Sequence, residues 1–199
     1  MQAKTQKGYS ESFILVLSAV ALFFILSSCC PVVSDKPLSQ PLKIDTDLEG
    51  VWKLESENQE IVYLHISALN EKFAAVSVEH RDDGKLDIIK TMFFLTRIKL
   101  GLYMNIHTNE LPKEELGTID GWMFLQIKFF NKDRFAMAHL NDQPIIDAVR
   151  NGELSGILTQ RDTRVNCVAL TDSSENMRNY IETHGDSLFI DPTVWNRVH

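Results

Sequence analysis

The stretch Val62-Tyr63-Leu64-His65-Ile66-Ser67-Ala68 decides the fold, because its apolar side chains stand at every second position. A period of two places alternate side chains on opposite faces of a β-strand. The same alternation recurs in residues 74–78, 102–107 and 123–130. The chain therefore predicts successive β-strands from residue 48 to about residue 140.

Short turn signals separate these runs. Arg81-Asp82-Asp83-Gly84 is typical of a hairpin turn because glycine adopts positive φ without a steric cost, and Asn131-Lys132-Asp133 is a second polar turn. Residues 85–99 predict one long strand or a bulged pair, and residues 154–170 add one or two strands. Short turns between consecutive strands favour an antiparallel meander, and closure into a barrel removes its unpaired edges. We therefore predict a mainly β domain, an antiparallel meander closed into a barrel.

Two short helices are predicted in the C-terminal half of the chain. The first begins at a cap formed by Asn141 or Asp142 and stops at Gly152. The second follows Asp172, which has capping-box spacing to a glutamate, and stops at Gly185. Its apolar stripe is expected to pack on the barrel wall or to plug one mouth of the barrel.

The N-terminal residues have the features of an export signal. Lys4 and Lys7 precede the apolar run Phe13–Leu26. This run of about 14 residues fits a signal peptide and is short of the ~20 needed to cross a bilayer as a helix. Leu26-Ser27-Ser28-Cys29 then resembles the lipobox of bacterial lipoproteins. An ordinary secretory signal and an uncleaved anchor are the alternatives.

The lipobox resemblance implies lipidation of one cysteine, with cleavage in front of it and usually N-acylation, for example with palmitate. Cys29 fits this role better than Cys30, because a leucine then lies three residues upstream with two serines between them. We expect residues 1–28 to be the signal peptide, residues 29–46 a flexible tether and residues 47–199 the β-barrel domain. The protein would then be lipid-anchored in the cell envelope, at the outer membrane facing the periplasm if the host has two membranes.

Composition excludes one class of partner. The formal net charge is −7, so phosphate backbones would repel the chain and nucleic-acid binding is disfavoured. Contact with a membrane would instead depend on the lipid anchor. After acylation of Cys29, the remaining thiols are Cys30 and Cys167. They either form a disulfide or stay free, with Cys167 as a small buried apolar side chain.

Gly50-Val51-Trp52 resembles the Gly-x-Trp signature that opens the first strand of lipocalins and other calycins. In that family the tryptophan packs across the closed end of the barrel, an arginine stacks on it, and the barrel holds small hydrophobic molecules. Arg161, Arg164 and Arg197 are the candidates for this arginine here. The resemblance implies a calycin-like or lipocalin-like barrel; the alternative is a tryptophan that belongs only to the core.

A second resemblance covers most of residues 48–198. The motifs that carry it, besides Gly50-x-Trp52, are Tyr63-Leu64-His65-Ile66, Val78-Glu79-His80, Asp83-Gly84-Lys85-Leu86, Asn151-Gly152-Glu153-Leu154-x-Gly156, Thr183-His184-Gly185-Asp186-Ser187-Leu188-Phe189 and Arg197-Val198. They are similar to those of an uncharacterised family of bacterial envelope lipoproteins. This resemblance implies kinship and location, and no mechanism.

The titratable and nucleophilic residues form no catalytic signature. The histidines of the predicted domain are His65, His80, His107, His139 and His184. They lack the short spacings of metal ligands, so we interpret them as surface side chains, with a ligand site as the alternative. Ser155-Gly156 lacks the preceding Gly-x of a nucleophile elbow. We therefore predict no enzyme activity, no metal and no other cofactor.

The barrel interior is where the functional hypotheses differ. A barrel of about eight strands either fills its interior with side chains or holds one small ligand. The phenylalanines are compatible with both: Phe93, Phe94, Phe124, Phe129, Phe130 and Phe135. The first hypothesis is a membrane-anchored envelope lipoprotein that binds a lipid or another small hydrophobic molecule in its barrel. The alternative is an accessory subunit of an envelope protein complex, with a filled barrel and a contact such as the loop 109–120.

Overall fold

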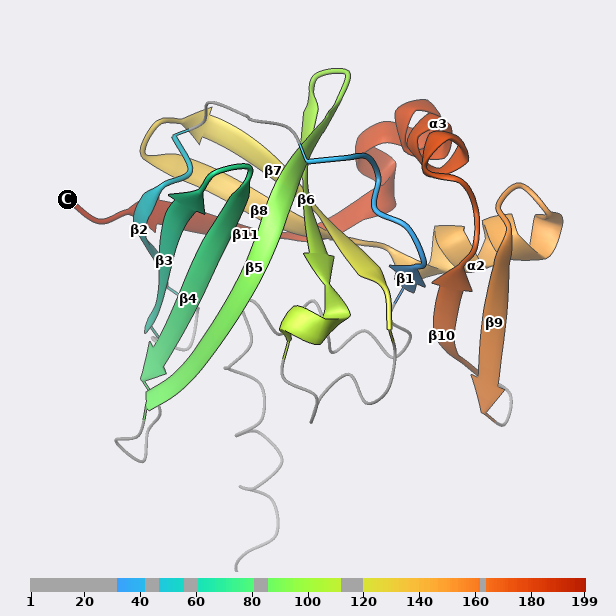
Figure 1. Ribbon diagram of the computed structural model, residues 1–199, viewed down its shortest axis with the longest axis horizontal. Coiled ribbons are helices and arrows are strands. Elements are labelled where there is room, and N and C mark those ends of the chain that lie inside the picture. The colour runs from blue at the N-terminus through green and yellow to red at the C-terminus, as the bar shows by residue number, and fades with distance from the viewer. Residues whose placement is uncertain (1–31, 42–46, 56–60, 81–85, 112–119, 162–163) are drawn as a thin grey trace, which may run out of the picture.

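A closed antiparallel barrel forms the centre of the structure, which is a computed structural model (Figure 1). It describes residues 32–41, 47–55, 61–80, 86–111, 120–161 and 164–199. The strands are β1 (Val32–Ser34), β2 (Gly50–Glu55), β3 (Ile61–Leu69), β4 (Lys72–His80), β5 (Leu86–Ile98), β6 (Gly101–His107), β7 (Trp122–Asn131), β8 (Arg134–Leu140), β9 (Gly156–Arg161), β10 (Arg164–Leu170) and β11 (Phe189–Arg197). The helices are α2 (Asp142–Asn151) and α3 (Ser174–His184), with short 3-10 turns η1 (Thr108–Glu110) and η2 (Gly185–Leu188).

Eight strands close the barrel in the order β2-β3-β4-β5-β6-β7-β8-β11, and β11 returns to β2. Neighbouring strands of this ring are antiparallel. The predicted mainly β meander, its closure into a barrel and the two helices in the C-terminal half are therefore confirmed. The hairpin β9–β10 stands outside the ring and joins it through β1 (Figure 1).

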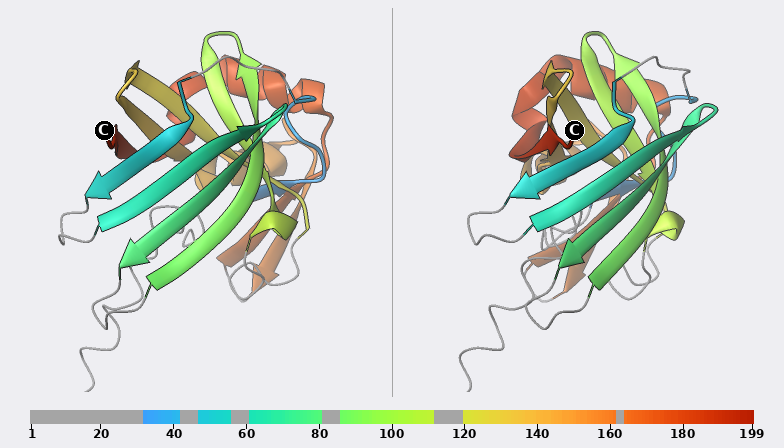
Figure 2. Two further views of the ribbon diagram at one scale, coloured as in Figure 1. Left: turned by 60° about the vertical axis from the view of Figure 1, so that its left-hand side comes forward. Right: turned by 90° about the vertical axis from the view of Figure 1, so that its left-hand side faces the viewer.

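The alternation in the sequence becomes an inside and an outside of the barrel. In β3, Val62, Leu64 and Ile66 are buried in the inner core, whereas His65 is exposed on the outer face. Figure 2 shows β2 to β5 as one curved wall. Following the residue pairing once round the ring displaces the register by about 12 residues. A stagger larger than the strand number tilts the strands strongly and widens the barrel compared with an eight-stranded barrel of shear 8.

The segment that precedes the barrel differs from our prediction. We expected residues 29–46 to be a flexible tether, but its described part, residues 32–41, packs against the outside of the barrel. Val32 to Ser34 form β1, which runs parallel to β10, and Leu38 is fully buried. The backbone N–H of Leu38 donates to Oδ1 of the buried Asn105 at 3.0 Å. Val32, Val33 and Leu38 are buried apolar side chains within this proline-rich and serine-rich stretch, and their burial explains why it packs against the barrel.

Both helices lie on the side of the barrel away from β2 to β5 (Figures 1 and 2). Asn141 caps α2 by accepting from the N–H of Gln143, and Gly152 ends it in the left-handed conformation, as predicted. The apolar stripe of α3 packs on the barrel wall, where Met177 and Ile181 join an outer core that includes Phe124. Of the two predicted positions for this helix, the structure shows packing on the barrel wall and not the plugging of a mouth.

The cap of α3 is Ser173, one residue later than predicted. Its side chain accepts from the N–H of Asn176. The carboxylate of Asp172 is instead buried and accepts from the N–H of Ser155 at 2.8 Å and of Ser173 at 2.9 Å. It therefore ties the start of α3 to the turn that precedes β9.

Several predicted features lie outside the described residues. These are the signal peptide, Cys29, Cys30, the turn at residues 81–84 and the centre of the loop at residues 112–119. Within the described part of the chain, neither helix is long and apolar enough to cross a bilayer.

Candidate ligand-binding barrel

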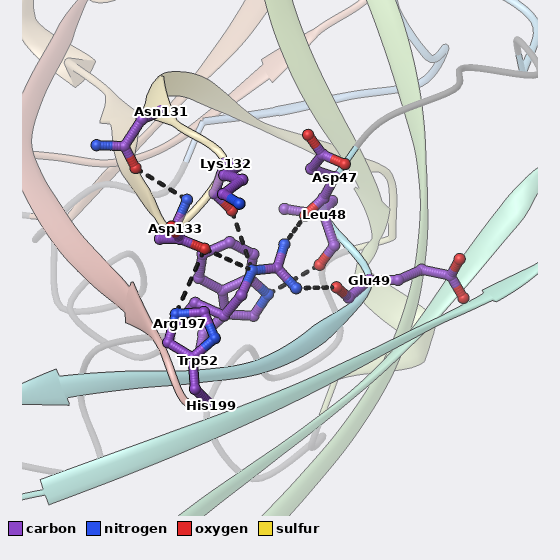
Figure 3. Close-up of polar contacts among 9 residues, drawn as sticks. All are labelled: Asp47, Leu48, Glu49, Trp52, Asn131, Lys132, Asp133, Arg197 and His199. Carbon is purple, nitrogen blue, oxygen red and sulfur yellow. Dashed lines mark hydrogen bonds and ion pairs between the residues drawn. The ribbon is translucent and has the colours of Figure 1, made fainter.

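Trp52 closes one end of the barrel, which we call the closed end (Figure 3). Its side chain is fully buried, and its Nε1 donates to the carbonyl oxygen of Leu48 at 2.8 Å. The ring of Phe135 meets it edge-on with the ring centroids 4.5 Å apart. The indole is thus fixed both by packing and by a hydrogen bond.

Arg197 covers the outer side of this indole. Its guanidinium carbon lies 4.2 Å from the centre of the Trp52 ring, a cation–π distance. The guanidinium donates to the backbone carbonyls of Asp47, Glu49 and Lys132. Its Nε also lies 3.7 Å from the carboxylate of Asp133. Among the three arginines considered from the sequence, Arg197 is the one stacked on Trp52; the side chains of Arg161 and Arg164 lie outside the described part.

Gly50 makes this stacking possible. Its φ is +136°, a conformation that L side chains rarely adopt, and a Cβ at this position would lie 2.5 Å from Nη1 of Arg197. A residue without a side chain is therefore required where the first barrel strand passes the guanidinium.

The inner wall above Trp52 is apolar. It is formed by side chains from β2 to β8 and β11 that point to the barrel axis. The buried members are Trp52, Val62, Leu64, Ile66, Phe73, Ala75, Phe93, Leu95, Leu102, Met104, Ile106, Met123, Leu125, Ile127, Phe135, Met137 and Trp195. Of the phenylalanines considered from the sequence, Phe93 and Phe135 are inside, Phe129 is partly buried against them, Phe94 and Phe124 are buried outside the inner core, and Phe130 is exposed.

The wall becomes polar toward the opposite end, which we call the mouth. There β4 ends and β5 begins, and Ser77, Glu79 and Thr91 are buried with at most 4% of their surface exposed. Ser77 and Glu79 continue the inner face of Phe73 and Ala75, and Thr91 continues that of Phe93. The interior thus combines an apolar floor with hydroxyl and carboxyl groups nearer the mouth.

His139 belongs to this mouth and corrects our interpretation of it as a surface residue. It follows Phe135 and Met137 on the inner face of β8, and only 12% of its side chain is exposed. Burial lowers the pKa of His139, against the opposing effects of Asp191 and Asp142. The nearest carboxylate oxygen, of Asp191, lies 3.8 Å from its Nε2.

The other described histidines lie outside the barrel. His65 is exposed, and His184 is bound in the last turn of α3, where its Nδ1 is 2.9 Å from the carbonyl of Tyr180. His107 packs edge-on against Trp122 at 4.7 Å and lies 3.7 Å from Asp120. Among the described residues, no group of three metal-ligating side chains gathers at one point.

Cys167 is half-buried in β10. Burial raises the pKa of its thiol, which keeps the thiol protonated. It is free of disulfide bonds to described residues. Cys30 lies outside the described part, so the proposed pairing of the two stays a prediction.

Comparisons of the chain with protein-family models, with curated proteins and with solved structures found no match in any of the three. Function is therefore inferred from the site itself. The alternation in the sequence identified the apolar wall, but we missed Ser77, Thr91 and Trp195 as interior residues. The signal was available for Ser77 and Thr91, because each stands two positions from an apolar inward residue. Trp195 stands two positions before Arg197, the last residue of the last strand.

Proposed function

We propose that the protein is a lipid-anchored envelope lipoprotein whose barrel binds a lipid or another small hydrophobic molecule. The observation that carries the binding function is the interior itself. A ring of eight strands surrounds an apolar wall, with one end covered by Trp52 and Arg197 and polar groups toward the other. An apolar interior of this kind favours a ligand that is mostly hydrocarbon.

The stagger of the strands supports a ligand. A register displacement of about 12 residues gives a wider barrel than the shear of 8 found where side chains fill the interior completely. The side chains nearer the mouth are also short: Ala75, Ser77 and Thr91 occupy neighbouring inward positions on β4 and β5. These three residues are at most 4% exposed, so a ligand that reaches them requires neighbouring side chains to shift.

The anchor is proposed at Cys29, from the lipobox resemblance. Cys29 is three residues before Val32, so their Cα atoms lie at most about 11 Å apart. Because β1 is bound to β7 and β10, the barrel would stay close to the membrane rather than move freely above it. Mass spectrometry of the mature protein tests the anchor: an acylated Cys29 is expected, and a Cys29→Ala variant that keeps its size and membrane fractionation would refute it.

A fluorescent hydrophobic probe tests the binding function. Residues 30–199 contain the whole described domain, so this chain is titrated with N-phenyl-1-naphthylamine. We expect saturable binding of one probe per chain and loss of binding in Ala75→Phe, which fills the interior. Ala74→Phe is the matched control, because Ala74 precedes Ala75 on the outer face of the same strand.

Circular dichroism establishes that both variants are folded. If Ala75→Phe does not fold, the milder Ala75→Leu replaces it. Equal binding by the inner and outer variants, or no saturable binding by the unmodified chain, would contradict a ligand in the barrel.

A groove at the closed end favours the alternative, an accessory subunit that binds a partner protein. It has a volume of about 540 Å³ between the hairpins β5–β6 and β7–β8. Leu100 at the tip of the first hairpin is 96% exposed, and Arg97 and Lys128 line the groove beside it. A photo-crosslinking residue at position 100 tests this function: one reproducible adduct in membranes is expected, and it should disappear in Arg97→Glu.

A further inference from the structure

The groove at the closed end lies where two hairpins of the barrel separate. The pairing of β6 with β7 ends at Leu102–Ile127. Nearer the closed end, Gly101 of β6 pairs with β5, whereas Phe129 and Asn131 of β7 pair with β8. The hairpins β5–β6 and β7–β8 therefore diverge (Figure 1), and the space of about 540 Å³ between them is the groove. Sites for small molecules typically have volumes of ~300–1,000 Å³.

The floor and one rim of the groove are apolar. Leu102 and Ile127 of the inner core form the floor, and Phe129 packs against this core while staying partly exposed. Leu100, which is 96% exposed, forms the rim. Unlike the barrel interior, the groove is open to solvent. An apolar group can therefore reach Leu100 and Phe129 without any shift of core side chains.

Cations from both hairpins line the groove. Arg97 of β5 is paired with Leu102 of β6, so the two side chains lie on the same face of the sheet. Lys132, in the turn between β7 and β8, comes from the other hairpin. Both residues are exposed, and within the described part of the chain neither side-chain cation forms a hydrogen bond or an ion pair. These two cations are therefore available to a ligand.

The acidic side chains of the groove do not balance the basic ones. The charged residues that line it are Arg97, Lys128, Lys132, Asp47 and Asp186. Asp186 accepts from Nε2 of Gln126 at 2.7 Å and lies 3.8 Å from Nζ of Lys128, so it is paired within the protein. Cations thus outnumber carboxylates in this groove, although the formal net charge of the chain is −7. An anion is the ligand that this local excess favours.

We propose that the groove binds a small amphipathic anion, a carboxylate, sulfonate or phosphate joined to one aromatic or hydrocarbon group. The acid group contacts Arg97 and Lys132, and the apolar group lies on Leu100 and Phe129. This site is separate from the barrel interior, so it goes beyond the binding proposed there. Because the groove is open to solvent, its ligand should exchange quickly and be lost during purification, unlike a molecule enclosed in the barrel.

Two fluorescent probes test the requirement for an anion. 1-Anilinonaphthalene-8-sulfonate is N-phenyl-1-naphthylamine with an added sulfonate, so the probes share the apolar group and differ in charge. Both are titrated into residues 30–199 carrying Ala75→Phe, which fills the barrel interior and leaves the groove unchanged. We expect one saturable site per chain for the sulfonate, and binding of the neutral probe about tenfold weaker or less. Equal affinities, or no saturable binding of the sulfonate, would overturn the proposal.

Removal of single cations tests the position of the site. In the same background, Arg97→Gln is expected to weaken binding of the sulfonate about tenfold and Lys132→Gln about threefold. Arg150→Gln is the matched control and should leave binding unchanged, because Arg150 lies on α2, beside Asp147, and does not line the groove. Circular dichroism establishes that the variants are folded.

Competition against the sulfonate probe identifies the source of the anion. Laurate is expected to displace the probe, whereas 1-dodecanol, which has the same chain length and no charge, should not. Vesicles of dioleoylphosphatidylglycerol should not displace it either, because the groove holds one molecule and not a bilayer surface. Displacement by 1-dodecanol as effective as that by laurate, or displacement by the vesicles alone, would contradict a single bound anion.

The outcomes separate this site from the barrel interior. If N-phenyl-1-naphthylamine does not bind the unmodified chain while the sulfonate binds the Ala75→Phe chain, binding in the barrel fails and the groove stands. If Arg97→Gln and Lys132→Gln bind the sulfonate as tightly as Arg150→Gln does, the anion site is wrong and the groove is left to the partner protein of the alternative function.

Discussion

The guanidinium carbon of Arg197 lies 4.2 Å from the centre of the Trp52 ring and joins the last strand of the barrel to the first. Within the described residues, β11 pairs with β2 at Asn196–Lys53 and Arg197–Trp52. The pairing at this seam is short, so the stacked side chain contributes to ring closure as well as covering the end of the barrel.

Replacement of Arg197 should open this seam. In Arg197→Ala, the loss of stacking and of hydrogen bonds to three backbone carbonyls is expected to reduce the free energy of unfolding by about 2–4 kcal/mol. Arg197→Lys should recover little, because an ammonium lacks the planar fork. Urea unfolding followed by circular dichroism measures both.

Arg134 provides the matched control. Its guanidinium lies 5.3 Å from the ring of Phe130, which is exposed, so Arg134→Ala should cost no more than about 1 kcal/mol. Similar costs at Arg134 and Arg197, or full stability of Arg197→Lys, would show that the stacked guanidinium is not what holds the seam.

Gly50→Ala tests the close approach of the first strand to the same guanidinium. The added Cβ would meet Nη1 of Arg197 at 2.5 Å in a backbone conformation that alanine rarely adopts, so a loss of about 2–3 kcal/mol is expected. Gly152→Ala also changes a glycine with positive φ, but its Cβ would meet nothing within 4 Å, and about 1 kcal/mol is expected. Equal losses in thermal unfolding would argue against the clash.

Stability should depend on pH through His139. Its pKa is lowered by burial in the folded protein, so below about pH 6.5 the unfolded chain takes up a proton that the folded chain does not. The contribution of this residue is therefore present above pH 6.5 and is lost as the pH falls toward its folded pKa. The difference in urea midpoint between the wild type and His139→Gln should therefore shrink as the pH is lowered from 8.0 through 6.5 to 5.5. A difference that does not change with pH would contradict this role; His65→Gln, exposed on the outer face, is the control.

Asp172 should be the acid-sensitive anchor of α3. Hydrogen bonds from the N–H groups of Ser155 and Ser173 and from the side chain of Asn176 outweigh desolvation and lower its pKa. Its contribution is present above pH 4 and is lost as the pH falls through its folded pKa. Asp172→Ala is expected to cost about 2–3 kcal/mol in urea unfolding at pH 7.

The exposed Asp147, which lies 3.7 Å from Arg150, serves as the control for this change. Its replacement by alanine should cost less than about 1 kcal/mol. A loss at Asp172 no larger than that at Asp147 would mean that the buried carboxylate does not hold α3.

The alternation of apolar residues was sufficient to predict the barrel, because alternate side chains of its strands line the apolar interior. On β3 the other face is partly exposed, whereas on β6 and β8 it is buried as well. The same reasoning failed for residues 32–41, where prolines and serines indicated a tether. Val32, Val33 and Leu38 were the signal for packing, but a short strand parallel to β10 depends on a contact with residues more than 130 positions away. Local composition carries no information on such a contact.

The site was predictable in part. Gly50 and Trp52 indicated the closed end, and the sequence narrowed the stacking arginine to three candidates without selecting Arg197. The selection needed the knowledge that the last strand closes on the first. His139 was misplaced because its polarity was given more weight than its position, two residues after Met137 on the inner face.

Native mass spectrometry of the purified chain of residues 30–199 tests most directly whether the barrel holds a ligand. The account predicts one bound hydrophobic molecule per chain, retained in Ala74→Phe and absent from folded Ala75→Phe. A chain that carries no bound molecule even after incubation with 1-monolauroylglycerol, or equal retention in the two variants, would contradict it.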